Sequence, residues 1–375
     1  MPVTPVAEFS NNDSTAGFNK RMPASPSPDD RASDALRLSG LDTANFGARL
    51  EFDCGNPDLI LDLCHRHAQA ILDAFYAARG LLVVKGLQQF TRDPAALVTL
   101  SRMFGNEVEV VRDTLTSDRF FHESVDEIMV LGNAEPCNHR PPPKAVGRED
   151  GSLPTRFPDQ PNWHTDQSYR RPPPDITLLL AVELPPRQQG QTLFADCTAA
   201  LESLETELQQ RLRALQGIHA PGWVGRSRAA VERGEKPRQL LPHQLPQRQP
   251  LVRKHPVTGA HSLYICEEKQ MDFIDGPIAG LAPGPDGEGA ALLRALLAQA
   301  TRDEFVYVHE WEPGDLVIAD NRNLLHCATW YDADRFTRLM WRTTVRGNPG
   351  DEYAGEGRSW LPRDGHAVMA GMEDA

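Results

Sequence analysis

One histidine in the chain is followed two positions later by a carboxylate. Of the twelve histidines, only His164, in the segment NWHTDQSYRRPPPD (residues 162–175), has Asp or Glu at the second following position, and this is Asp166. In extended backbone, residues i and i+2 point to the same side, so both side chains can reach one ion. An imidazole and a carboxylate suit a divalent metal such as Fe(II), Mn(II) or Zn(II). The alternative is an ordinary polar pair at the start of a strand.

A third ligand for such a metal must come from elsewhere in the chain. His326 follows apolar residues in DNRNLLHCATW, residues 320–330, which is a strand-like segment. A single histidine in a strand is commonly a structural residue, and this reading stays open for His326. If His326 does join the first pair, two histidines and one carboxylate occupy one face of a metal and leave three positions open. That is the ligand set of non-haem Fe(II) oxygenases.

Two arginines follow in a second strand-like segment. FTRLMWRTTV, residues 336–345, is rich in β-branched and aromatic residues, which favours a strand. Alternation puts Arg338, Met340, Arg342 and Thr344 on one face. If this face points inward, the guanidinium groups require a buried anion, and their planar shape suits a carboxylate. An inward arginine would then hold the distal carboxylate of a 2-oxo diacid whose keto-acid end chelates the metal. The alternation alone leaves an exposed arginine face equally open.

The elements around these residues predict a mixed fold, mostly β with flanking helices (α+β). The strands do not alternate regularly with helices, which argues against a doubly wound parallel sheet and favours a β-sandwich or barrel with helices outside. The predicted helices are 56–80, 93–104, 198–215 and 288–301, and the predicted strands are 81–87, 125–133, 175–186, 190–196, 250–265 (strand, turn, strand), 304–311, 314–321, 324–330 and 336–347.

The 375 residues predict one main domain with two irregular ends. Residues 1–34 are rich in Ser, Pro, Asn and Asp and are expected to form a flexible leader. The domain is expected to span 35–350, with a C-terminal tail at 351–375. Two long segments without periodicity, 136–161 and 219–250, are interpreted as insertions that shape a pocket.

Composition excludes several classes of partner. The net charge of −13 argues against nucleic acid, and no apolar run approaches the roughly 20 residues of a membrane helix. The N-terminus shows no signal peptide, and the six cysteines include no C-x-x-C pair. Free thiols in a reducing cytoplasm are therefore expected. A small-molecule substrate is the expected partner, and the sequence leaves a homo-oligomer open.

Several motifs resemble one known family. NWHTDQSYRRPPPDITLLLAVELPPRQQGQTLFAD resembles the N-W-H-T-D segment of the taurine dioxygenase family, which includes the phenoxyacetate-herbicide dioxygenases. The resemblance continues in HPVTGAHSLYI, in EFVYVHEWEPGDLVIADNRNLLHCATW and in RFTRLMWRTTVRG, and covers roughly residues 35–350. It implies a jelly-roll (double-stranded β-helix) barrel that uses Fe(II), 2-oxoglutarate as cosubstrate and O₂.

The resemblance also implies roles for single residues. Thr192, in GQTLF, matches the threonine that hydrogen-bonds 2-oxoglutarate, and Arg338 matches the arginine that pairs with its distal carboxylate. Arg342 matches a second arginine, which in taurine-type members helps to bind the substrate's sulfonate. The implied iron ligands, and the catalytic residues, are His164, Asp166 and His326.

The function implied by the resemblance is hydroxylation of a small anionic molecule with release of succinate and CO₂. Gln160 stands where the taurine enzyme has an asparagine, four residues before the first ligand histidine, so we expect a substrate other than taurine. Two other classes compete: a non-catalytic jelly-roll protein that binds metal or a small molecule, and a metal-dependent hydrolase. Arg338 with Thr192 argues against the first, and the lack of an obvious acid/base glutamate argues against the second.

Overall fold

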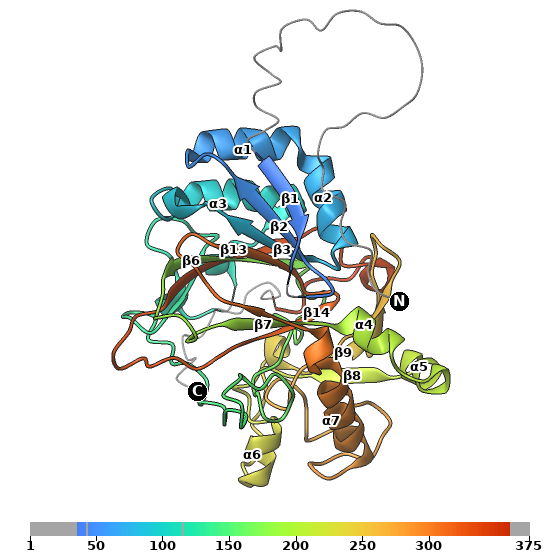
Figure 1. The fold of residues 1–375 in the computed structure, drawn as a ribbon. Coiled ribbons are helices and arrows are strands. Elements are labelled where there is room, and N and C mark those ends of the chain that lie inside the picture. Colours follow the sequence, from blue (N-terminus) through green and yellow to red (C-terminus); the bar gives the residue numbers. More distant parts are fainter. Residues whose placement is uncertain (1–35, 43, 115, 361–375) are drawn as a thin grey trace, which may run out of the picture.

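The fold of the chain is mixed α/β (Figure 1). A computed structural model describes residues 36–42, 44–114 and 116–360, so the leader predicted for 1–34 lies outside the described residues. The α-helices are α1 (Pro57–Arg66), α2 (Ala68–Ala77), α3 (Pro94–Ser101), α4 (Cys197–Glu202), α5 (Thr206–Arg213), α6 (Arg228–Glu232) and α7 (Glu288–Ala300). The strands are β1 (Leu36–Gly40), β2 (Ala48–Phe52), β3 (Leu81–Lys85), β4 (Glu107–Val108), β5 (Met129–Gly132), β6 (Ile176–Glu183), β7 (Thr192–Asp196), β8 (Gln216–His219), β9 (Gln247–Pro250), β10 (Val252–Lys254), β11 (His261–Leu263), β12 (Val306–His309), β13 (Leu316–Asp320), β14 (Leu324–Ala328) and β15 (Leu339–Arg346).

The larger sheet has eight strands and is covered by helices. Its order is β1-β2-β3-β13-β6-β15-β4, with β5 also paired to β15, and only the β2–β3 pair is parallel. Helices α1, α2 and α3 lie over its outer face (Figure 1). Buried residues of these helices, such as Ile60, Phe75 and Leu97, pack with Leu178 and Trp341 of the sheet. This core explains the apolar residues of the helices predicted at 56–80 and 93–104.

A smaller sheet, β12-β7-β14, faces the inner side of the larger one. Apolar residues of both sheets meet between them, including Phe194 on β7, Leu324 on β14 and Met340 on β15. The other face of the smaller sheet packs on α4 and α7, where Leu325 and Cys327 are buried. The sheets are separate, and no closed barrel forms among the described residues. The predicted mixture of sheets with flanking helices is therefore confirmed at this level.

Two predicted helices are each broken in the structure. The helix predicted for 56–80 is divided at His67, whose φ of −108° and ψ of 17° end α1 before α2 begins. Both halves bury their apolar residues in one core, so the apolar pattern runs through the break. The helix predicted for 198–215 is likewise α4 followed by α5. Every helix of the described residues is too short or too polar to cross a bilayer.

A buried cluster of charged and polar side chains lies at the end of β13, just before the strand that carries His326. Asp320 accepts hydrogen bonds from Arg322 at 2.8 and 2.6 Å and from His255 Nε2 at 2.9 Å. Burial alone would raise the pKa of Asp320, but Arg322 and His255 lower it below its usual value. We therefore expect Asp320→Asn to lower the free energy of unfolding by about 3 kcal/mol near neutral pH, measured by urea denaturation.

The pH dependence of this loss has a defined sign. The folded-state pKa of Asp320 is depressed. The ionised side chain therefore makes its full contribution to the free energy of unfolding at pH values above its unfolded-state pKa, and this contribution decreases as the pH falls below about 4. The exposed pair of Arg66 and Asp62, at 2.8 Å, provides the control. Asp62→Asn should cost less than about 0.5 kcal/mol. Equal losses at the two positions would contradict a specific role for the buried cluster.

Candidate metal centre and adjoining cavity

His164 and His326 lie side by side because their backbones pair. An isolated antiparallel bridge joins them, with N···O distances of 2.9 and 2.7 Å between the two residues. On β14, Leu324 points into the core between the sheets, so His326, two residues later, points to the same side. The ring centroids of the two histidines are 4.4 Å apart. The structure therefore places His326 beside the H-x-D pair.

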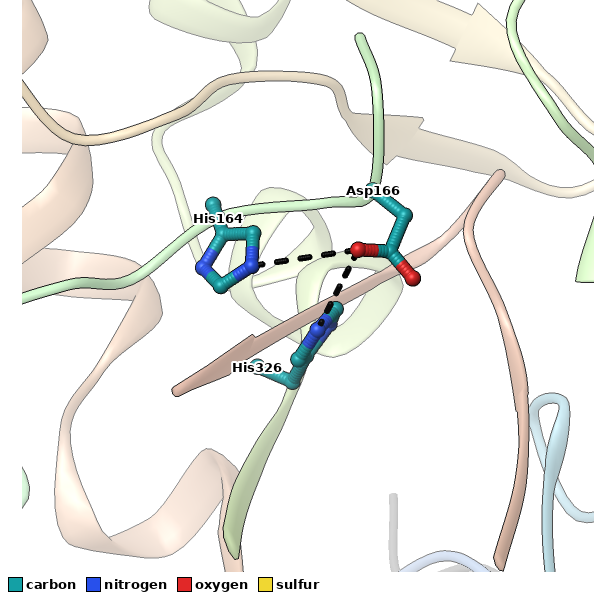
Figure 2. Close-up of side chains that lie close together, drawn as sticks. All are labelled: His164, Asp166 and His326. Carbon is teal, nitrogen blue, oxygen red and sulfur yellow. Dashed lines mark ion pairs between the residues drawn. The ribbon is translucent and has the colours of Figure 1, made fainter. Parts of the chain in front are cut away.

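One carboxylate oxygen faces both imidazoles (Figure 2). Asp166 Oδ1 lies 3.9 Å from His164 Nε2 and 3.8 Å from His326 Nε2. All three candidate ligand atoms lie within 4.8 Å of one another.

The imidazoles are held in the form that a metal requires. His164 Nδ1 is 2.7 Å from the carbonyl oxygen of Asn162, which can only accept, so Nδ1 carries the hydrogen and Nε2 keeps its lone pair. Burial lowers the pKa of His164, and burial together with His164 lowers that of His326 to about 3. Both rings are therefore neutral at physiological pH.

The carboxylate of Asp166 is ionised and fixed in place. Burial alone would raise its pKa, but Arg342, the two histidines and a hydrogen bond from Thr177 lower it below the usual range. Thr177 Oγ1 donates to Oδ2 at 2.6 Å, and Arg342 Nη1 donates to Oδ1 at 3.0 Å. Asn321 Nδ2 donates in turn to Thr177 Oγ1 at 2.9 Å. Two neutral nitrogen donors and one ionised oxygen donor therefore converge, which fits a divalent cation of intermediate softness.

The face of β15 that carries the arginines points inward. The exposed arginine face, which the alternation had left equally open, is therefore not the one observed. Met340 packs between the sheets, whereas Trp341 and Val345 pack under the helices. Arg342 therefore reaches Asp166, a contact that the motif match did not predict. Its Nε is buried without a hydrogen-bond partner among the described residues.

Arg338 is a buried cation that has no acidic partner among the residues the structure describes. Its side chain donates to Gly190 O at 3.2 Å, and its Nη2 lies 3.5 Å from Thr192 Oγ1. Within the described part of the chain, no carboxylate forms an ion pair with it, and burial lowers its pKa to about 10. Thr192 Oγ1 also accepts from Trp311 Nε1 at 3.0 Å, so its hydroxyl hydrogen is left to donate. A buried guanidinium beside a free hydroxyl donor fits a carboxylate-bearing ligand.

Gly190 is a residue of this site that the sequence reading passed over. Its φ is +65°, and a Cβ there would lie 3.1 Å from Arg338 Cδ and 3.2 Å from Arg338 Nε. Glycine is therefore required for both the turn and the close approach of Arg338. The one sequence feature that could have indicated its role was a glycine at the start of the strand predicted for 190–196.

A cavity of about 230 Å³ opens beside the candidate metal ligands. His164, Asp166 and Arg342 line its inner end. The 219–250 segment contributes residues to its wall, whereas residues from 136–161 are absent from the described lining. Gln160 is instead buried beside the thiol of Cys327. The remaining lining residues are Thr116, Ser117, Phe120, Met129, Gln167, Tyr169, Arg170, Pro221, Trp223, His243, Gln244, Gln270 and Trp360.

Comparison with known proteins gives consistent matches. Residues 39–344 match the model of the "Taurine catabolism dioxygenase TauD, TfdA family". The chain is 35% identical over 196 residues to the (S)-phenoxypropionate/alpha-ketoglutarate-dioxygenase of Sphingobium herbicidovorans, covering 51% of this chain and 64% of that protein. It is 36% identical over 186 residues to the alpha-ketoglutarate-dependent 2,4-dichlorophenoxyacetate dioxygenase of Cupriavidus pinatubonensis, covering 49% and 59%. The chain thus matches less than two thirds of the length of these relatives.

A solved structure shares the fold. The crystal structure of AAD-2 in complex with Mn(II) and N-oxalylglycine superposes with a TM-score of 0.58 at 26% sequence identity. The superposition covers 84% of this chain and 98% of that one.

Proposed function

Because this chain belongs to the TauD, TfdA family of taurine catabolism dioxygenases, we propose that it is an Fe(II)- and 2-oxoglutarate-dependent dioxygenase. It hydroxylates a small anionic substrate and releases succinate and CO₂. The observation that carries the proposal is the convergence of two neutral imidazoles on an ionised carboxylate at the end of a cavity. The proposal extends to the jelly-roll topology, to a single catalytic domain over 35–350 and to a cytoplasmic location.

His164, Asp166 and His326 are the proposed Fe(II) ligands. When bound, the iron supplies the activation of O₂ that oxidative decarboxylation of 2-oxoglutarate and oxidation of a substrate C–H bond require. The protein contributes geometry: the backbone pairing of the two histidines and the Thr177 hydrogen bond orient the donor atoms before the metal arrives.

Arg338 and Thr192 are the proposed binding groups for the distal carboxylate of 2-oxoglutarate. A carboxylate would give Arg338 the anion that the described residues do not provide and would accept the Thr192 hydroxyl hydrogen. N-oxalylglycine, bound by the solved relative, is a diacid of the same chain length as 2-oxoglutarate, which supports this assignment.

Arg342 is the proposed anion-binding residue at the inner end of the cavity. The relatives are named for phenoxypropionate and 2,4-dichlorophenoxyacetate, which supports a carboxylate or a similar anion on the substrate. Since Arg342 also donates to Asp166, it would link the substrate's anion to the metal ligand.

Two measurements test the function. Under anaerobic conditions, Fe(II) with 2-oxoglutarate should produce a weak visible charge-transfer absorption, and neither a hydrolase nor a simple binding protein requires one. Succinate release should then be measured with aryloxyacids, sulfonates, alkyl sulfates and amino acids as substrates. Iron binding without the absorption band would overturn the proposal.

Gly190→Ala should impair 2-oxoglutarate binding without touching either cosubstrate or metal. The added methyl group would press on Arg338 and occupy a left-handed backbone position. We expect KM for 2-oxoglutarate to rise about ten-fold, the effect of weakening one charged hydrogen bond. Gly259→Ala is the control, because its φ is +71° but no atom lies within 4 Å of the new Cβ. An equal change in KM for both variants would show that strain alone is responsible.

A further inference from the structure

The last described segment of the chain, residues 349–360, lies across the loop that carries the metal ligands. We call it the C-terminal strap, and it begins beyond residue 344, where the family match ends. Ser359 N–H donates to the Arg171 carbonyl at 2.8 Å, and Arg171 N–H donates to Ser359 Oγ at 2.9 Å. Glu356 forms an ion pair with Arg171 at 2.7 Å. The strap is therefore bound to the 162–175 loop through both backbone and side chains.

The other end of the strap is anchored in the protein interior. Arg253, which is fully buried, donates to the carbonyl of Pro349 at 2.5 Å. Its guanidinium also lies 5.0 Å from the ring centroid of Tyr353. The Tyr353 hydroxyl donates to Gln249 Oε1 at 2.8 Å, and Gln249 donates to the carbonyl of Ser168 at 2.8 Å. The first residue of the strap is thus anchored by Arg253, and Tyr353 is linked through Gln249 to the loop beside the metal centre.

Trp360 is held against a buried charge cluster. It is 3% exposed, with the Arg346 guanidinium 4.1 Å and the Arg170 guanidinium 5.5 Å from its ring centroid. Both arginines bind Glu109, at 2.6 Å from Arg346 Nε and 3.0 Å from Arg170 Nη1. Cation–π contacts that are shielded from water are comparatively strong. The indole therefore has a fixed place.

The fixed indole is part of the cavity wall. Trp360 shares the lining with three other aromatic residues, Phe120, Tyr169 and Trp223, and with Arg342 at the metal end. The cavity accordingly has flat aromatic surfaces and one guanidinium, that of Arg342, beside the candidate metal ligands. Such a lining fits a planar ring that carries an anion.

We propose that Trp360 is a specificity-determining residue, and that the C-terminal strap limits the substrate to an anion with a single aromatic ring. This inference rests on the proposed function, because it assigns the cavity to the substrate. It adds to the cavity wall a residue from a segment outside the family match. Removal of the indole opens space at the wall and removes a stacking surface for a single ring.

The test uses the full chain loaded anaerobically with Fe(II) and 2-oxoglutarate. Dissociation constants are measured by titration calorimetry for phenoxyacetate and for the larger 2-naphthoxyacetate. We expect Trp360→Ala to weaken phenoxyacetate binding about ten-fold and to improve relative binding of 2-naphthoxyacetate at least ten-fold, as for other changes of pocket size. Trp360→Phe, which keeps an aromatic ring and the fold, should give an intermediate ratio.

The control is Glu356→Gln, on the same strap but outside the cavity lining. It should leave the ratio of the two dissociation constants unchanged. A ratio within two-fold of wild type in both Trp360 variants would overturn the proposal. Wild-type protein that forms the Fe(II)–2-oxoglutarate absorption but binds neither probe would also overturn it, while leaving the proposed function intact. Absence of that absorption would count against the proposed function instead, and the probe ratio would still test Trp360.

Discussion

Asp166→Ala is expected to lower succinate formation at least about 1,000-fold and to release iron on gel filtration. Loss of a hydrogen-bond partner of a metal ligand typically costs 10–100-fold, and loss of the ligand itself should cost more. Asp166 supplies the one anionic donor among the three candidate ligands of the described chain, and the substitution also leaves Arg342 facing the two histidines without this ion-pair partner. A divalent ion would then meet a nearby cation and two neutral donors. Bound iron is measured by chelator assay after desalting.

Two further variants separate the effect of losing the ligand from that of losing its hydrogen bond and from that of changing any buried aspartate. Thr177→Val removes the hydroxyl that donates to Asp166 Oδ2, and it should cost about 10–100-fold in iron affinity or turnover. Asp196→Asn changes an equally buried aspartate whose carboxylate caps α4 through Thr198 N and Ala199 N. Asparagine caps helices nearly as well as aspartate, so iron content and turnover should be retained. Wild-type iron content in Asp166→Ala would contradict the ligand assignment.

The three-residue centre was predictable because its parts depend on short-range features. His164 and Asp166 share a side through the two-residue period of extended backbone, and Leu324 sets the direction of His326 in the same way. The pairing between the two histidines is long-range, and only the order of family motifs suggested it. Their protonation is a tertiary property, since it follows from burial and from the Asn162 carbonyl.

The contacts of Arg342 and Trp360 could not be predicted from the sequence, because they depend on long-range packing. Arg342 meets Asp166 because β15 pairs with β6, which places Arg342 opposite Leu179. No local pattern specifies that register. Residues 351–360 were predicted as part of a C-terminal tail, yet Trp360 is buried against Arg346 of β15. The break at His67 was hidden because both helices bury residues in one core.

Arg338→Met is expected to separate stability from cosubstrate binding. The side chain is buried without an ion-pair partner in the described part of the protein, and its pKa is lowered by burial to about 10. Replacing an unpaired buried cation with an apolar chain of similar length should raise the free energy of unfolding by about 1–3 kcal/mol without ligand. The same change removes the proposed partner of the distal carboxylate, and KM for 2-oxoglutarate should rise roughly 100–1,000-fold. Urea denaturation and succinate formation measure the two effects.

Arg346→Met, on the same strand, is the matched control with the opposite sign. Arg346 binds the buried Glu109, and its loss leaves that carboxylate with Arg170 as a remaining partner. The substitution should therefore lower the free energy of unfolding by about 1.5–3 kcal/mol, the contribution of a hydrogen bond to a charged group. Stabilisation by added 2-oxoglutarate should persist in this variant and disappear in Arg338→Met, because only the latter loses the carboxylate site. If both variants lost stability equally, the folded protein would already satisfy the charge of Arg338. The case for a bound diacid at that position would then fail.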